Sequence, residues 1–263
     1  MQNLKVALGQ FAVKKGNPSA NWEIVQRMTA EAARQGANVV VFPELWDGGY
    51  RLDEAETFAN VLGEGLFVQL ANLARQQNVH IIGSTFEKCN PGVANTASVI
   101  SPDEGLLASY QKIHLFPLMD EHLYLKPGVG PIQLDTVWGP TALAICYDLR
   151  FPELFRNYAV AGTKVTFLPS EWPHPRLEHF RILLRARAIE NQMFMITCNR
   201  VGVDEDSGTH FCGHSMVVDP WGEIVIELGE GEGVYTVEID LALVDDVRQR
   251  IPILKDRRPE HYK

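Results

Sequence analysis

Apolar runs with the character of buried strands recur along this chain, and three of them end at a side chain that could do chemistry. These side chains are Glu44, Lys112 and Cys146. The run before Glu44, residues 38–42, is continuous and rich in β-branched residues, which is typical of a strand covered on both faces. We expect the three strands to end at one sheet edge, where a carboxylate, an ammonium and a thiol would meet.

The rest of the chain alternates between helical and extended patterns. A helix is predicted to begin after Asn17, with Pro18 at its first position, and to end at Gly36. Residues 229–233 are predicted to form a hairpin or loop between strands. Helices interspersed among strands indicate two mixed sheets with helices outside. The other predicted helices are 66–77, 152–161, 177–191 and 241–250, and the predicted strands are 4–11, 38–42, 79–84, 94–100, 105–112, 131–136, 141–145, 164–168, 193–198, 211–218, 223–228 and 234–239.

Length and composition favour one domain over residues 1–263. The chain is 46% hydrophobic, enough to bury a full core, and no linker-like or repetitive stretch divides it. Its formal net charge is −9, with Lys and Arg scattered along the chain. This argues against a nucleic-acid partner, which needs a concentrated basic face. A small anionic substrate is still compatible with the charge, because one Arg in a cleft can outweigh it locally.

Targeting and redox features favour a cytoplasmic protein. The first residues lead directly into a strand-like pattern without the apolar core of a signal peptide, and no window approaches the roughly 20 apolar residues of a membrane span. The four cysteines are Cys89, Cys146, Cys198 and Cys212, without CxxC spacing. Neither a disulfide scaffold nor a zinc ribbon is therefore expected. No dinucleotide, P-loop, serine-hydrolase or zincin motif occurs either.

Taken singly, the three reactive residues have structural alternatives: a helix-capping glutamate, a solvated lysine and an inert core thiol. Their flanking sequences favour chemistry. Residues 41–46 (VFPELW), 110–114 (YQKIH) and 144–153 (AICYDLRFPE) resemble the segments that carry the Glu-Lys-Cys set of the nitrilase or carbon–nitrogen hydrolase superfamily. The Cys-Tyr-Asp sequence at the nucleophile is most similar to the ω-amidase branch. The likeness continues, in the family's order, through residues 213–215, 219–223 and 248–252.

The resemblance implies a four-layer α-β-β-α sandwich with two mixed sheets that forms a homodimer or a larger homo-oligomer. It implies an enzyme that uses no metal or other cofactor, with Glu44, Lys112 and Cys146 as its catalytic residues. Glu121, by its distance to residues 126–128, matches a second glutamate that the family places beside this set, where it positions the lysine and the substrate. A solvated loop glutamate is the alternative for Glu121.

Amide hydrolysis needs a nucleophile, an oxyanion site and a proton for the departing ammonia. We expect Glu44 to take the thiol proton as Cys146 attacks, to pass it to the leaving nitrogen, and then to activate the water that cleaves the thioester. The oxyanion is expected between the Lys112 ammonium and the backbone N–H of Tyr147. Lys112 and a nearby helix N-terminus favour the thiolate whereas Glu44 opposes it, so we expect one proton to be shared between Glu44 and Cys146.

The ω-amidase branch predicts a small-molecule amide as the partner, most simply the ω-amide of an α-keto acid such as 2-oxoglutaramate or 2-oxosuccinamate. Trp172, Arg176, Tyr50 and Arg150 are the candidate substrate-binding residues. Arg150 and Arg176 could each bind a substrate carboxylate bidentately. Arg176 is preferred because residues 172–176 resemble a stretch of the bacterial ω-amidases, and a surface arginine at a helix start is its alternative. The aromatic candidates could instead belong to the core. General aliphatic amides, N-carbamoyl amines and deaminated glutathione are the alternative substrates.

Two alternatives belong to other classes of protein. Positions two apart on a strand share a face, so His210, Cys212 and His214 could point toward one zinc ion that hydrolyses amides. The second alternative is a non-catalytic scaffold with the same fold. It is disfavoured because all three reactive positions are present with their flanking residues.

Overall fold

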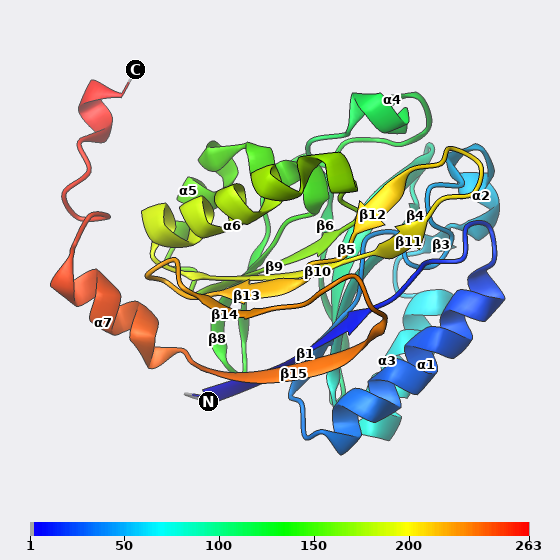
Figure 1. The fold of residues 1–263 in the computed structure, drawn as a ribbon, viewed down its shortest axis with the longest axis horizontal. Coiled ribbons are helices and arrows are strands. Elements are labelled where there is room, and N and C mark those ends of the chain that lie inside the picture. The colour runs from blue at the N-terminus through cyan, green and yellow to red at the C-terminus, as the bar shows by residue number, and fades with distance from the viewer. Residues whose placement is uncertain (1–2, 263) are drawn as a thin grey trace.

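The computed structural model describes residues 3–262, and residues 1–2 and 263 of the predicted domain lie outside the described residues. Two large mixed sheets pack face to face, and helices cover both outer faces (Figure 1). This is the four-layer α-β-β-α sandwich expected from the sequence. The first sheet contains, in spatial order, β15 (Gly233–Asp240), β1 (Asn3–Gln10), β2 (Val39–Val41), β4 (His80–Lys88), β5 (Val93–Ser101) and β6 (Gly105–Gln111), with β3 (Asn60–Val61) paired to β4.

The second sheet is built on a parallel centre with antiparallel strands outside it. Its order is β14 (Ile224–Glu227), β13 (Met216–Val218), β10 (Phe194–Asn199), β9 (Val165–Ser170), β8 (Gly139–Leu143) and β7 (Gln133–Thr136), and a separate ribbon pairs β11 (Val201–Val203) with β12 (His210–Cys212). Strands β8, β9 and β10 run parallel to one another. Their carboxyl ends therefore reach the same edge of the sheet.

Helices α1 (Pro18–Arg34) and α3 (Leu66–Gln77) cover the first sheet, and α5 (Pro152–Val160) and α6 (Leu177–Asn191) cover the second (Figure 1). Helix α1 begins as predicted, since the Asn17 side chain accepts a hydrogen bond from the Ala20 N–H at 3.1 Å. The remaining helices are the short α2 (Ala55–Phe58) and α4 (Glu121–Tyr124), neither of which was predicted, and α7 (Ala242–Arg250). Within residues 3–262, none of the helices has the length and apolar character needed to cross a membrane.

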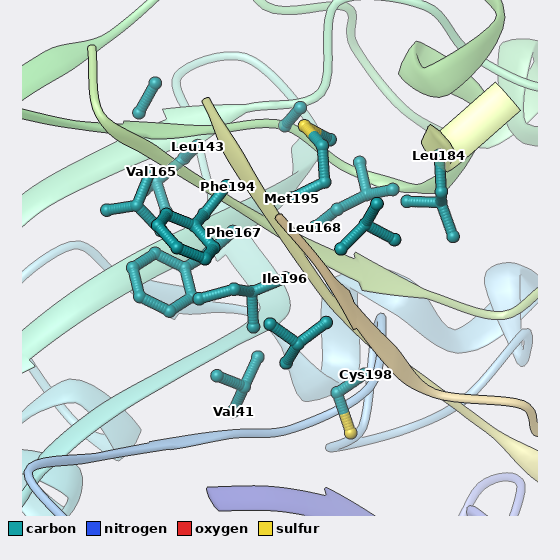
Figure 2. Packing of buried hydrophobic residues seen from close by; sticks show 14 of the residues in the cluster. Val41, Leu143, Val165, Phe167, Leu168, Leu184, Phe194, Met195, Ile196 and Cys198 are labelled. Atoms are coloured by element: carbon teal, nitrogen blue, oxygen red, sulfur yellow. The ribbon is translucent and has the colours of Figure 1, made fainter. Parts of the chain in front are cut away.

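The core between the sheets fixes their relative placement. Val39 and Val41 of β2 face this core, while Val40 packs under α1 and α3. A strand covered on both faces was the prediction for this run. Figure 2 shows Val41 near Phe167 and Ile196 of the second sheet, all three fully buried. Because this packing holds the two sheets rigidly, side chains at the ends of strands from both sheets can be kept in contact.

One predicted strand is wrong. Residues 211–218 do not form a continuous strand, because β12 ends at Cys212 and β13 begins at Met216. Between them Gly213 and His214 have φ angles of 62° and 51°, which no extended strand contains.

Candidate active site

Three strand ends meet at one edge of the sandwich. Glu44 follows β2 and Lys112 follows β6 in the first sheet, whereas Cys146 follows β8 in the second. The Lys112 Nζ lies 2.7 Å from Glu44 Oε1, and both side chains are fully buried. The Glu44 carboxylate also lies close enough to the Cys146 thiol to raise its pKa. The structure thus brings together the three side chains that the sequence predicted would converge.

Cys146 sits on a strained turn. It is the first residue of a 3₁₀ helix, Cys146–Arg150, and its φ of 41° is unfavourable for a residue with a Cβ. The first N–H groups of such a helix, that of Tyr147 among them, have no partner within the helix. A strained residue at a strand-to-helix turn is typical of functional sites, where the surrounding structure holds the strain.

The Asp148 carboxylate locks this turn. It accepts hydrogen bonds from the Ile145 N–H at 2.9 Å and the Tyr110 hydroxyl at 2.7 Å. Its other oxygen lies 3.1 Å from the His114 N–H and 2.7 Å from His114 Nδ1. Tyr110 and His114 flank Lys112, so Asp148 ties the segment that carries the lysine to the turn that carries the thiol.

The Glu44 carboxylate has a donor on each oxygen. Oε1 accepts from Lys112 and from the Asn95 side-chain amide at 2.8 Å, and Oε2 accepts from the backbone N–H of Glu171 at 3.0 Å. These donors fix the orientation of the carboxylate beside Cys146. A buried carboxylate needs such partners to offset the loss of hydration.

Glu121 is the second carboxylate on the lysine. It is fully buried at the start of α4, and its Oε1 lies 2.6 Å from Lys112 Nζ. It also accepts hydrogen bonds from the Tyr50 hydroxyl at 2.5 Å and the Phe116 N–H at 2.7 Å. The alternative interpretation of Glu121 as a solvated loop residue is therefore wrong.

The electrostatics of the site follow from burial and from the two carboxylates. Burial lowers the pKa of Lys112, but Glu121 and Glu44 outweigh it and hold that pKa above its usual value. Burial, reinforced by the charge of Glu44, raises the pKa of Cys146 well above its usual value, against the opposing influence of Lys112. Burial thus outweighs the Lys112 ammonium, which was expected to favour the thiolate. The raised pKa favours the neutral thiol, and the Glu44 carboxylate lies beside it.

A small cavity lies over the thiol. Cys146, Tyr147 and Trp172 line it, together with Arg150 and Arg176. The Arg150 guanidinium stacks 4.6 Å above the Trp172 ring, and the Trp172 indole N–H donates to the Arg176 carbonyl at 2.8 Å. Its volume of about 10 Å³ has room for about one water molecule.

Of the four candidate substrate-binding residues, Tyr50 stands apart. Trp172, Arg150 and Arg176 line the cavity, but Tyr50 is absent from its lining among the described residues. Instead, its hydroxyl donates a hydrogen bond to the Glu121 carboxylate. The sequence does not show whether an aromatic residue after a strand end lines the cavity or contacts Glu121 instead.

The residues of the zinc alternative do not form one site. His210 is stacked on His174 with its Nε2 3.5 Å from Glu230, whereas His214 Nδ1 lies 2.7 Å from Glu227. The Cys212 thiol is buried and donates to the Trp172 carbonyl. The break after Cys212 removes the shared strand face on which the alternative depended. Over residues 3–262, no cluster of three or more His, Cys, Asp or Glu side chains has the arrangement to hold a metal.

Sequence reasoning missed Asn95, Glu171 and Arg200, which complete the surroundings of Glu44. Asn95 lies inside β5, where one amide among apolar residues gives no distinct signal. Glu171 follows the end of β9, directly before Trp172, so its position after a buried strand was a usable signal. Arg200 pairs with Glu171 through side chains, which no local pattern reveals.

Comparisons with known proteins agree over nearly the whole chain. The carbon–nitrogen hydrolase family model matches residues 5–249. The chain is 40% identical over 256 residues to the 2-oxoglutaramate amidase of Bacillus subtilis (strain 168), covering 96% of this chain and 97% of that protein. It is 33% identical over 271 residues to an omega-amidase of Mus musculus, covering 100% of this chain and 98% of that protein.

Solved structures include an informative relative. A variant of the amidase from Nesterenkonia sp. AN1 shows the acetamide moiety of fluoroacetamide added covalently at its active-site cysteine. That structure matches this one with a TM-score of 0.85 at 27% identity, covering 98% of this chain and 95% of that chain.

Proposed function

The chain belongs to the carbon–nitrogen hydrolase family, and we propose that it is an amidase that converts the ω-amide of a small α-keto acid, such as 2-oxoglutaramate, to the carboxylate and ammonia. The observation that carries this proposal is the contact of Glu44 with both Lys112 and Cys146 beneath a cavity lined by two arginines. Similarity to a 2-oxoglutaramate amidase along nearly the whole chain supports the substrate class.

The proposed reaction has two halves. Glu44 accepts the thiol proton as Cys146 Sγ attacks the amide carbon, and the tetrahedral oxyanion is held by Lys112 and the Tyr147 N–H. Glu44 returns the proton to the nitrogen, the C–N bond breaks, and ammonia leaves a thioester on Cys146. Glu44 then deprotonates a water that cleaves the thioester, and the proton returns to sulfur.

Lys112 and Glu121 act as a unit in this scheme. The raised pKa of Lys112 keeps the ammonium charged, so that it can donate to the oxyanion throughout the cycle. Glu121 holds the ammonium together with Glu44. We assign Glu121 the role of positioning the lysine.

Arg176 and Arg150 are the proposed partners of the substrate carboxylate. Both arginines line the cavity. Burial lowers the pKa of Arg150, and the positive charge of Arg176 contributes in the same direction. Two cations in one cavity attract an anion, and an Arg fork binds a carboxylate bidentately.

If Arg176 binds the substrate carboxylate, its removal should affect the KM of keto-acid amides but not that of neutral amides. We expect Arg176→Ala to raise KM for 2-oxoglutaramate by roughly 10- to 100-fold, in line with the loss of a charge-assisted bidentate contact. The KM for a neutral amide such as propionamide should change little. Steady-state ammonia release measures both values, and equal losses on the two substrates would remove the assigned role.

The activity itself is tested by ammonia release over a panel of keto-acid amides, aliphatic amides, N-carbamoyl amines and a deaminated-glutathione amide. Cys146→Ala is expected to abolish release from every substrate of the wild type. Cys198→Ala is the matched control, because Cys198 is also buried but lies in the core between the sheets. Full activity of Cys146→Ala would overturn the proposal.

Three coarser features are proposed alongside the activity. We propose that residues 1–263 form one domain. We propose that the protein is cytoplasmic, and cell fractionation tests this location. We also propose a homodimer through the outer face of α5 and α6, because Val160, Ile182 and Ile189 are apolar side chains about half exposed or more there.

A further inference from the structure

One backbone amide bridges the two halves of the site. The Glu171 N–H donates to Glu44 Oε2 at 3.0 Å. It also lies close enough to Cys146 to contribute to lowering the pKa of its thiol, against the larger effect of burial, and both residues line the same cavity. Glu44 belongs to the first sheet, whereas Cys146 and Glu171 belong to the second. The position of this single peptide group therefore sets how the carboxylate and the thiol face each other across the sandwich.

The side chain of Glu171 is anchored by an arginine. Glu171 Oε2 lies 2.9 Å from Arg200 Nη1, and the two side chains are 0% and 2% exposed. Arg200 also donates to the Val13 carbonyl at 3.0 Å and lies 4.4 Å over the Phe211 ring. Its backbone N–H donates to the Ser170 carbonyl, directly before Glu171. Arg200 thus holds the Glu171 segment through both its side chain and its backbone.

This pair is poorly suited to a role in stability alone. The desolvation of two buried charges largely offsets their attraction, so such a pair adds little to the free energy of unfolding. Burial also raises the pKa of Glu171 to about 8, against the influence of Arg200. An oxygen of the carboxyl group can accept from the guanidinium in either protonation state. The pair does fix the orientation of the Glu171 side chain and of the peptide group attached to it.

We propose that Glu171 and Arg200 form a positioning pair, which holds the Glu171 N–H where it can stabilise negative charge on either Glu44 or Cys146. The inference rests on the proposed function, since it takes these two groups as base and nucleophile. While the proton moves between sulfur and carboxylate, the negative charge moves the other way, and this N–H faces both positions. A shift of the peptide would weaken both contacts, because catalysis depends steeply on such distances.

The test compares Glu171→Met, Arg200→Met, the double variant and Glu171→Gln. Each single Met variant is expected to lower kcat by roughly 10- to 100-fold while KM changes by less than about threefold. Either one also leaves a buried group unpaired and is expected to lower the melting temperature. The double variant removes both groups, so its stability should recover while its kcat stays low. Glu171→Gln keeps an acceptor for Arg200 and should retain most of the activity.

A second readout does not depend on the substrate. The rate at which iodoacetamide alkylates Cys146, located by mass spectrometry, reports how readily the thiol gives up its proton. It should fall in the double variant. The control pair is Arg181 and Glu227, whose side chains are 2.7 Å apart but contact neither Glu44 nor Cys146. Changing both to Met should leave kcat and alkylation unchanged.

The outcomes separate this inference from the function on which it rests. A stable double variant with wild-type kcat and wild-type alkylation would overturn the positioning pair. So would an effect on KM alone, because that would make Glu171 a substrate contact. Activity that survives Cys146→Ala would instead overturn the proposed function.

Discussion

At the scale of single residues, the site is governed by the burial of one ammonium between two carboxylates. Lys112 lies within 2.7 Å of Glu44 and 2.6 Å of Glu121, and all three side chains are fully buried. In water these contacts would contribute little, but inside the protein each charge needs the others because none is hydrated. Removing one of them therefore disturbs the remaining two.

Glu121→Gln tests this coupling. The variant keeps the shape of the side chain but removes a charge from Lys112, so the ammonium is held less firmly beside Glu44. We expect kcat to fall by roughly 10- to 100-fold, as for other displaced catalytic groups. Asp120→Asn is the matched control, because the neighbouring Asp120 is exposed. Equal activity of the two variants, measured by ammonia release, would contradict a positioning role for Glu121.

The raised pKa of the buried Asp47 side chain predicts that the free energy of unfolding depends on pH. Burial raises its pKa from 3.8 to about 7, and backbone N–H groups, that of Phe86 first, oppose the rise. The folded protein therefore holds a proton between these two values that the unfolded chain has lost. This contribution to the free energy of unfolding is complete below pH 4 and is lost as the pH rises through 7.

Asp47→Asn should remove this part of the slope. Relative to the wild type, the variant is expected to gain on the order of 4 kcal/mol between pH 4 and pH 8, from about 1.4 kcal/mol per pKa unit. Urea unfolding at several pH values measures the difference. Parallel stability curves for the two proteins would show that Asp47 does not titrate in this window.

At the scale of elements, the site depends on short segments that follow the strands. The end of β6 is held on both sides: Gly128 donates its N–H to the Lys112 carbonyl at 2.8 Å, and Asp148 binds Tyr110 and His114. These contacts are non-local, so the lysine is placed by segments that come later in the chain. Changes in the backbone of those segments should reach the ammonium.

Gly128→Ala is the element-scale test. A Cβ at Gly128 would lie 2.1 Å from the Gln111 carbonyl oxygen, and since that atom is backbone, the segment beside Lys112 has to shift. We expect a loss of about 1–3 kcal/mol in the free energy of unfolding, as for other overpacked sites, and a lower kcat. A Cβ at Gly130 meets nothing within 4 Å, so Gly130→Ala is the control. Comparable stability of the two variants would refute the argument.

At the scale of the whole molecule, one buried core joins both sheets and helices α5 and α6. The outer face of α6 carries Ile182 and Ile189, which are 62% and 49% exposed and seven residues apart on one stripe. Exposed apolar side chains in a stripe are typical of surfaces that another chain covers. This is the face that we propose as the dimer interface.

Changing Ile182 and Ile189 together to Asp should separate the subunits. Light scattering after size-exclusion chromatography is expected to give twice the chain mass of 29.5 kDa for the wild type and the single mass for the variant. Val129→Asp changes another exposed apolar residue, on a loop, and should leave the dimer intact. A monomeric wild type, or a dimeric double variant, would rule out this interface.

Much of the architecture was predictable because it follows from local patterns. The helices over residues 66–77 and 177–191 have the bounds that were predicted, since apolar spacing and helix ends are written in consecutive residues. The strand over 211–218 failed because the sequence pattern does not show that His214, a non-glycine residue, adopts a left-handed conformation. The zinc alternative failed with it.

The sequence by itself determined that a carboxylate, an ammonium and a thiol each follow a buried strand. They were expected at one sheet edge, but Glu44 and Lys112 follow strands of the first sheet and Cys146 follows a strand of the second. Only the tertiary structure decided their environment: that Glu121 is buried against Lys112, that Tyr50 supports it, and that Glu171 and Arg200 hold the opposite side of Glu44. The physical reason is the separation along the chain over which each kind of interaction acts. Strand and helix patterns act over a few residues, whereas these contacts join side chains that are from 9 to more than 100 residues apart along the chain.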